Sequence, residues 1–138
     1  MIILDTNVLS ELMRPEPDYK VVAWVQEQAD QELYTTALTK AEILFGLAIL
    51  PVGKRRSAIT SEAARVFSED FPGRVLAFSG EAAVEFAALS AQRRRQGRPI
   101  SVFDGMIAGI ARWRGAAIAT RNTADFEGIG IRLVDPWS

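Results

Sequence analysis

The hydrophobic and polar positions of the chain switch between two periods, which predicts strands and helices in alternation. Short apolar runs bounded by turn residues predict strands at Ile2–Leu4, Leu33–Thr36, Arg74–Phe78, Ala116–Ala119 and Ile131–Val134. Longer segments with helical spacing of apolar residues predict helices at Asn7–Met13, Tyr19–Ala29, Thr39–Leu50, Lys54–Phe71, Glu81–Gln96 and Val102–Trp113. Strands that alternate with helices are typical of a mainly parallel sheet. We therefore predict a single α/β domain over residues 1–138.

Several acidic residues stand at positions where a charge is unexpected. Asp5 directly follows the first apolar strand, and Asn122 and Asp125 follow a later strand in the same way. In parallel sheets, ligands bind just outside these carboxyl ends of the strands. Glu42 and Asp104 belong to predicted helices with apolar neighbours on the same face, where an unpaired charge is costly. We expect these side chains to converge at one edge of the sheet.

Helix capping and turn formation are the alternative interpretation of each acidic position. Asp5 can cap the helix that follows it. The segments Thr39–Glu42 and Ser101–Asp104 both have the spacing of a capping box, and Asn122 and Asp125 can begin turns. Each alternative is credible alone, but caps have no reason to gather at one place.

The composition narrows the chemistry that these residues can perform. The chain is 49% hydrophobic and 24% charged, and its net charge of −1 leaves nucleic-acid binding to local basic patches. It has no long apolar run and no charged leader, so we expect neither a membrane span nor a signal peptide. The absence of Cys fits a reducing cytoplasm, and the absence of His excludes His-based catalysis.

Carboxylate oxygens are hard ligands, and without His or Cys beside them they favour the binding of Mg²⁺ or Mn²⁺. Such an ion suits the hydrolysis of phosphate esters, because it binds phosphate and activates water. The chain has no Gly-rich phosphate-binding motif, so the use of a nucleoside triphosphate is unsupported. Hydrolysis of a phosphodiester is the better fit.

Four motifs in order resemble the PIN domain, in particular the VapC toxins and their FitB-like relatives. They are Met1–Ser10, Thr39–Glu42, Phe103–Ala108 and Ala119–Thr123. The resemblance spans the chain to its Val134–Trp137 ending. It implies a three-layer α/β/α fold with a central, mainly parallel sheet, and a Mg²⁺- or Mn²⁺-dependent endoribonuclease that is the toxin of a type II toxin–antitoxin system.

The resemblance also assigns residues to roles. Asp5, Glu42 and Asp104 match the three acidic metal ligands. The fourth acidic position departs from the family, because Asn122 stands where many relatives have Asp, and Asp125 is the candidate for the missing catalytic charge. In this assignment, metal held by Asp5 and Asp104 polarises the phosphate and Glu42 orients the attacking hydroxide. The expected products carry 5′-phosphate and 3′-hydroxyl ends.

The substrate and the partners are likewise implied. Arg121 is the best candidate for a substrate-phosphate contact, and Thr120 and Asn122 lie beside it. Two further basic clusters, Arg93–Arg98 and Lys54–Arg56, are interpreted either as solvated helix ends or as RNA contacts. The family implies a cognate VapB- or FitA-like antitoxin, a homodimer and higher toxin–antitoxin assemblies. Four apolar side chains are candidates for the antitoxin groove or for the core: Trp24, Leu44, Leu47 and Leu50.

Three other functions compete with this assignment. A catalytically weak PIN-like module that binds RNA or a partner is the main alternative, because Asn122 is neutral. A phosphatase of the haloacid-dehalogenase type needs a second Asp two residues after the first, and Asn7 excludes it. A DNA nuclease of related architecture is disfavoured, because the chain offers no additional DNA-binding module.

Overall fold

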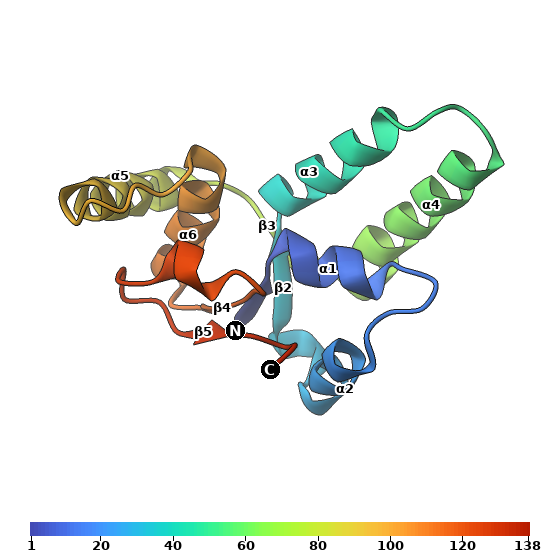
Figure 1. Cartoon of the computed structure of the whole chain (residues 1–138), viewed down its shortest axis with the longest axis horizontal. Coiled ribbons are helices and arrows are strands. Elements are labelled where there is room, and N and C mark those ends of the chain that lie inside the picture. Colours follow the sequence, from blue (N-terminus) through green and yellow to red (C-terminus); the bar gives the residue numbers. More distant parts are fainter.

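A computed structural model describes all residues, 1–138, and its centre is a fully parallel five-stranded sheet (Figure 1). The strands are β1 (Ile2–Leu4), β2 (Leu33–Thr36), β3 (Val75–Leu76), β4 (Ala117–Ala119) and β5 (Leu133–Val134). Their order is β3-β2-β1-β4-β5, and Ile2 of β1 pairs with Leu33 on one side and with Ala117 on the other. The predicted strands are confirmed, three of them with shorter bounds.

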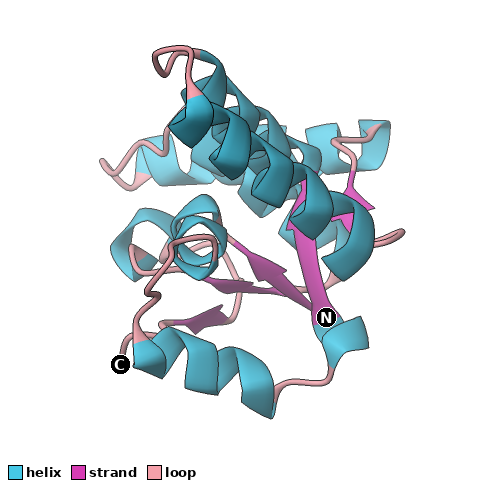
Figure 2. Ribbon diagram, turned by 90° about the vertical axis from the view of Figure 1, so that its right-hand side faces the viewer, coloured by secondary structure: helices cyan, strands magenta, loops and turns pink.

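Helices cover both faces of this sheet, as Figure 2 shows. They are α1 (Thr6–Leu12), α2 (Tyr19–Glu27), α3 (Ala37–Ala48), α4 (Lys54–Arg65), α5 (Gly80–Arg95) and α6 (Val102–Arg114). A π-helical turn, Val66–Asp70, continues α4, and short 3-10 turns occur at Asp30–Glu32 and Thr123–Phe126. The helices α3 and α4 form a hairpin that projects away from the sheet (Figure 1). No helix combines the length and the apolar character that crossing a bilayer would require.

Successive side chains of the central strands point to opposite faces of the sheet and pack in two separate hydrophobic cores. Ile3 and Ile118 point toward α5 and α6, whereas Ile2 and Leu4 point toward α1, α2 and the π-helical turn. All four side chains are at most 7% exposed. This alternation is the period-2 geometry of a strand buried on both faces. The predicted three-layer α/β/α fold is therefore confirmed.

Polar caps fix where the helices at the carboxyl edge begin. Asp5 caps α1 by accepting a hydrogen bond from the amide of Thr6, and Ser101 caps α6. The alternative interpretation of Thr39 and Glu42 as a capping box is wrong, because Thr36 caps α3 and accepts the Thr39 amide at 3.1 Å. The helix α3 consequently starts two residues earlier than predicted, at Ala37.

The strand order places a binding crevice at one edge of the sheet. After β1 the chain builds β2 on one side, and later β4 on the other. Open parallel sheets bind ligands at such a switch point, outside the carboxyl ends of the strands. Asp5 and Thr120 directly follow β1 and β4, so both lie at this point.

Candidate active site

The acidic side chains predicted from the sequence meet in one polar pocket of about 350 Å³. No hydrophobic side chain lines it; its walls are Asp5, Thr6, Asn7, Ser10, Glu42, Asp104, Asn122 and Asp125. We call it the acidic pocket. Asp5 arrives from the end of β1, Glu42 from α3, Asp104 from the first turn of α6, and Asp125 from the loop after β4. Four separate segments therefore deliver one carboxylate each.

Asp5 is the most buried of these carboxylates, with 6% of its surface exposed. Its Oδ1 accepts a hydrogen bond from the Thr6 amide at 2.8 Å, and its Oδ2 accepts one from the Thr120 hydroxyl at 2.8 Å. A carboxylate has about four lone-pair sites, so two hydrogen bonds leave room for a cation. The capping role and a metal-binding role are therefore compatible in the same side chain.

Thr120 is completely buried, and its hydroxyl joins both sides of the crevice. It donates to Asp5 and accepts from the Asn7 side chain at 3.3 Å and from the Asn122 amide at 3.1 Å. These three bonds use the whole capacity of a hydroxyl. We expected Thr120 beside the substrate, but its burial leaves it no path to RNA, and we reassign it to the positioning of Asp5.

Glu42 is tied to the same network from α3. The Thr6 hydroxyl donates to Glu42 Oε2 at 3.4 Å and also contacts the Thr39 hydroxyl at 3.1 Å. Thr39 is fully buried, whereas Glu42 is exposed toward the pocket. The polar positions Thr6 and Thr39 thus connect α1 with α3 and hold Glu42 near Asp5.

The acidic pocket disfavours its own negative charge. Burial raises the pKa of Asp5, against the hydrogen bonds from Thr120 and Thr6, and repulsion from Glu42 and Asp125 raises it further. Burial, and then repulsion from Asp5, also raises the pKa of Asp104. Burial, with repulsion from Asp104, raises the pKa of Glu42. Glu42 is the most exposed of the three residues, so solvent screens its charge most strongly. A cation would relieve this repulsion.

The donor set fits Mg²⁺ or Mn²⁺. The side chains of the residues that line the pocket end in carboxylate, amide or hydroxyl groups, whose oxygens are the ligands that these hard ions prefer. The carboxylates do not close into a compact group of three or more ligands. Mg²⁺ commonly binds through one or two carboxylates and keeps several waters. The pocket therefore fits a hydrated ion better than a fully dehydrated one.

Replacement of Asp104 by Asn should stabilise the metal-free protein at neutral pH. Because folding raises the pKa of Asp104, the folded chain binds its proton more tightly, and this stability is lost as the pH rises through the raised pKa. Asn keeps the volume and removes the charge. Solvent screens this half-buried carboxylate, so thermal unfolding at neutral pH should shift upward by no more than roughly 2–4 °C, the effect of about 1 kcal/mol in a domain of this size.

The gain should disappear below about pH 4, where the carboxyl group is protonated in both states. The same change at Asp30, an exposed acid outside the acidic pocket, should leave the thermal unfolding temperature nearly unchanged. A gain at Asp104 that persisted in acid would mean that packing, and not charge, causes it. Saturating Mg²⁺ should reverse the order of the two proteins, since only the wild type keeps the full ligand set.

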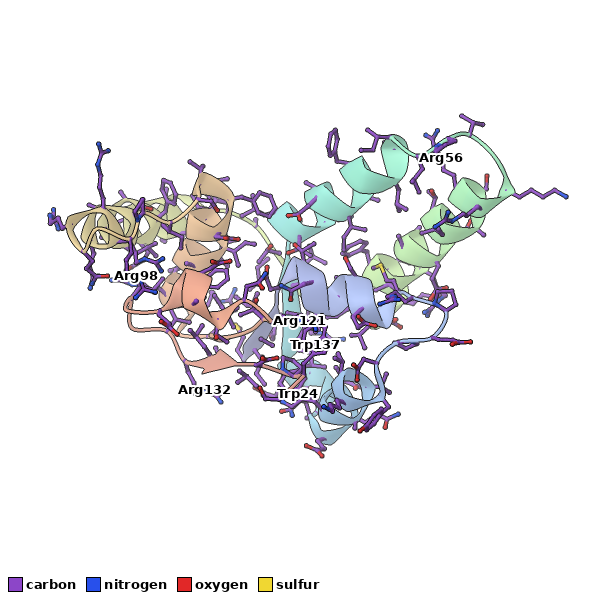
Figure 3. All side chains as sticks on the ribbon, viewed as in Figure 1. Trp24, Arg56, Arg98, Arg121, Arg132 and Trp137 are labelled. Atoms are coloured by element: carbon purple, nitrogen blue, oxygen red, sulfur yellow. The ribbon has the colours of Figure 1, made fainter.

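Arg121 lies at the rim of the acidic pocket and is not part of its wall. Its backbone amide donates to Asn7 Oδ1 at 3.3 Å, and Asn7 does line the pocket. The guanidinium group stacks on the ring of Trp137, 5.0 Å from the ring centroid (Figure 3). The Trp137 contact, which the sequence did not reveal, holds an exposed cation next to the site.

The basic cluster at the end of α5 divides into different roles. Arg94 and Arg95 are exposed, whereas Arg93 is only 5% exposed and donates to backbone carbonyls. Neither interpretation of the cluster, solvated helix end or RNA contact, is correct for Arg93. Arg98 pairs with Glu127 at 3.3 Å. The exposed members alone remain available to a phosphate backbone.

The apolar side chains considered for an antitoxin groove also divide. Leu47 is buried. Trp24 is partly buried and packs against the core beneath α1 and α2, whereas Leu44 is 39% exposed. Phe45 and Ile49, which we did not single out from the sequence, are 66% and 68% exposed. The outer face of α3 is thus an exposed apolar surface.

A larger cavity, of about 560 Å³, lies at the opposite edge of the sheet. Met1, Ala117 and Arg132 line it, and these residues lie at the amino ends of their strands. Its charged side chains Glu85 and Arg112 pair with each other at 3.1 Å. It has no cluster of acids, so the smaller pocket is the better candidate for the chemistry.

Comparison with known proteins agrees with this architecture along the chain. A family model described as the PIN domain matches residues 2–131. The VapC ribonuclease Y4jK of Sinorhizobium fredii is 43% identical over 99% of this chain and 98% of its own length. The toxin FitB of Neisseria gonorrhoeae is 34% identical over 99% of both chains. The solved structure of FitAB bound to the IR36 DNA fragment matches with a TM-score of 0.94 and 34% identity, covering 100% of this chain and 96% of that one.

Proposed function

This chain belongs to the PIN-domain family, and we propose that it is a metal-dependent endoribonuclease acting as the toxin of a toxin–antitoxin pair. The observation that carries the proposal is the convergence of four carboxylates from four segments in one polar pocket at the switch point of the sheet. The ribonuclease and toxin names of relatives that match over their full length support it. We also propose that residues 1–138 form one PIN domain, which the match over residues 2–131 supports.

Asp5, Glu42 and Asp104 would hold the ion. When bound there, Mg²⁺ or Mn²⁺ supplies charge neutralisation at the scissile phosphate and lowers the pKa of water. Glu42 is exposed toward the pocket and its pKa is raised, so it is suited to orient a water molecule and to accept its proton. The hydrogen bond from Thr120 fixes the Asp5 carboxylate, so Asp5 would hold the ion at a defined place relative to Glu42.

The fourth acidic role is shared in this chain. Asn122 and Asp125 both line the acidic pocket, so the neutral amide and the displaced carboxylate face the same space. Asn122 would offer only a neutral oxygen ligand, so a second strongly held metal ion is disfavoured. Asp125 lines the same pocket and would supply its negative charge toward a single ion, directly or through water.

RNA would approach over the rim that carries Arg121. A guanidinium held on Trp137 loses little conformational freedom when it contacts a phosphate group. The resemblance to FitB-like toxins implies a cognate antitoxin and a homodimer. The exposed Phe45 on α3 and the exposed Ile49 directly after it give an antitoxin helix an apolar surface to bind. The acidic pocket would accept an Arg of such a partner. We also propose that the RNA on which it acts is cytoplasmic.

The purified chain should cleave defined RNAs in Mg²⁺ or Mn²⁺ and lose this activity in EDTA. Hydrolysis by an activated water molecule should leave 5′-phosphate and 3′-hydroxyl ends, which ligation and end-labelling can identify. Restoration by Mn²⁺ after EDTA, but not by Ca²⁺, would exclude general instability of the chelated protein. Recovery of 2′,3′-cyclic phosphate ends would overturn the proposed mechanism.

The second candidate function is a PIN-like module that binds RNA or a partner without efficient cleavage. The neutral Asn122 in the acidic pocket is the observation that favours it. Replacing Asn122 by Asp discriminates the two functions. A wild type that binds RNA but cleaves only after this change would be a binding module.

A further inference from the structure

Arg93 is a buried cation without an anionic partner. Only 5% of its surface is exposed, and its guanidinium group donates to three backbone carbonyls and to no carboxylate. The acceptors are the carbonyls of Arg98 at 2.6 Å, Asp125 at 2.8 Å and Glu127 at 3.1 Å. Burial of a charge is costly unless it is hydrogen-bonded in this way. The residue therefore has a strong local reason for its position.

Three neighbours of Arg93 hold the same loop. The side chains of Gln92 and Gln96 donate to the carbonyl of Gly128 at 3.2 Å and 3.4 Å. Arg98 donates to the carbonyl of Ala124 at 3.3 Å and pairs with Glu127. The last turn of α5 and the residues that follow it thus supply donors to the loop Ala124–Gly128, which we call the Asp125 loop. These three residues are exposed, so Arg93 is the only buried residue among the four that donate to this loop.

The Asp125 loop is also anchored from the core. Phe126 is 1% exposed and packs among the buried side chains beneath α5 and α6. The amide of Asp125 donates to the carbonyl of Asn122 at 3.1 Å. Arg93 binds the carbonyls on either side of Phe126, at Asp125 and Glu127. The backbone of Asp125 is consequently fixed while its carboxylate lines the acidic pocket.

The contacts of Arg93 and Phe126 hold the Asp125 loop against electrostatic repulsion within the acidic pocket. The carboxylate of Asp125 faces those of Asp5 and Asp104, and like charges repel unless a cation lies between them. An unanchored loop would relieve the repulsion by moving outward. A loop that is already held in place does not have to be ordered when the ion binds, which favours binding.

We propose that Arg93 is a positioning residue: its side chain fixes the backbone of the Asp125 loop and so keeps the Asp125 carboxylate in the metal site. This inference rests on the proposed function, because it assigns Asp125 to the binding of the ion. Arg93 does not line the acidic pocket, so it would act through the loop and not on the ion. Its positive charge matters less than the number and the direction of its donors.

The direct test is the affinity of the purified chain for Mn²⁺ alone, measured by calorimetry or by the Mn²⁺ electron paramagnetic resonance signal. Arg93→Gln should weaken Mn²⁺ binding about 10-fold, the effect typical of residues that orient metal ligands. In the metal-free protein, the amides of the Asp125 loop should exchange faster with solvent. The control is Arg94→Gln, which removes the same charge from an exposed neighbouring position and should change neither quantity.

A double-mutant cycle separates positioning from general destabilisation. If Arg93 acts through Asp125, then Arg93→Gln should have little effect on Mn²⁺ affinity once Asp125 is Asn. An equal loss in both backgrounds would overturn the proposal, as would Mn²⁺ binding by Arg93→Gln equal to that of Arg94→Gln. If Arg93→Gln does not fold, Arg98→Gln removes the exposed bond to Ala124 and should show a smaller loss in the same direction. An unchanged affinity in Arg98→Gln would then count against the proposal. A wild type that binds no Mn²⁺ would contradict the proposed function itself.

Discussion

Replacing Asp5 by Asn should abolish RNA cleavage while leaving the fold intact. The change removes the most buried charge of the acidic pocket. Asp5 lines the pocket and also accepts the hydrogen bond from the Thr120 hydroxyl. Loss of an ion ligand should exceed the 10–100-fold cost of losing a residue that merely orients one, so we expect a fall of at least ~100-fold. Asn is as good a helix cap as Asp, so α1 should keep its start.

The fold should be retained in the metal-free state. The pKa of Asp5 is raised by burial, so its ionised form destabilises the folded chain at neutral pH, and Asn removes that charge. This gain offsets the loss of one of the two hydrogen bonds that the Asp5 oxygens accept from Thr6 and Thr120, because Asn has a single side-chain oxygen. Cleavage should therefore be lost while the thermal unfolding temperature stays close to that of the wild type. A variant that lost activity because it unfolded would show both falling together.

Asp18→Asn is the matched control. Asp18 caps α2 by accepting the amide of Lys20 at 2.9 Å, so the same chemical change is made at another helix start outside the acidic pocket. Cleavage by this control should stay within about 2-fold of wild type, since most substitutions away from a site have small effects. If Asp5→Asn kept a tenth or more of the wild-type rate, Asp5 would not be an essential ligand.

The parts of the fold that the sequence predicts well are those with a single local cause. The run Ile2–Leu4 followed by Asp5 admits one interpretation, because three apolar residues and a charge end a buried strand and begin a helix. The start of α3 was missed because Thr36 and Thr39 are both good caps. Only the tertiary structure, which buries Thr39 against Thr6, makes Thr36 the cap.

The supporting residues of the site were the harder part. Arg93 belongs to a run of arginines that suggests a solvated helix end, yet it lies four residues after the fully buried Leu89 and on the same helical face. That spacing is a signal, but what a buried Arg binds depends on a loop more than 30 residues away. The stacking of Arg121 on Trp137 likewise joins distant segments. Long-range pairs of this kind have no periodicity in the sequence.

The contrast between local signals and long-range pairs also explains why the acidic pocket could be predicted from its carboxylates. A buried charge at the end of an apolar strand, or beside the apolar stripe of a helix, is locally anomalous. Asp5 and Asp104 both carry that anomaly. Thr120 does not, because a threonine after a strand is ordinary, and its role is visible only through its three hydrogen bonds.

Replacing Gly109 by Ala should destabilise the protein strongly, because α5 and α6 meet at this position without room for a side chain. A Cβ atom at Gly109 would lie 2.6 Å from the carbonyl oxygen of Ala82 and 3.1 Å from the backbone nitrogen of Phe86. Both atoms belong to the backbone of α5, which cannot move aside as a flexible side chain could. Ala favours a helix over Gly by about 1 kcal/mol, but overpacking typically costs 1–3 kcal/mol or more. With backbone atoms at these distances we expect the upper end, and a fall in Tm of roughly 5–10 °C.

Gly46→Ala gives the opposite sign and is the control. Gly46 also lies inside a helix, but a Cβ atom there meets nothing within 4 Å, so the substitution should stabilise by roughly 0.5–1 kcal/mol. Gly105→Ala should be intermediate, because its obstacle at 2.9 Å is the Phe86 ring, which can rotate. Since α6 carries Asp104 and α5 carries Arg93, forcing these helices apart at Gly109 should weaken Mn²⁺ binding as well. Thermal unfolding of the three variants, measured with and without Mn²⁺, checks both effects. An unchanged Tm for Gly109→Ala would show that α5 and α6 are not in close contact.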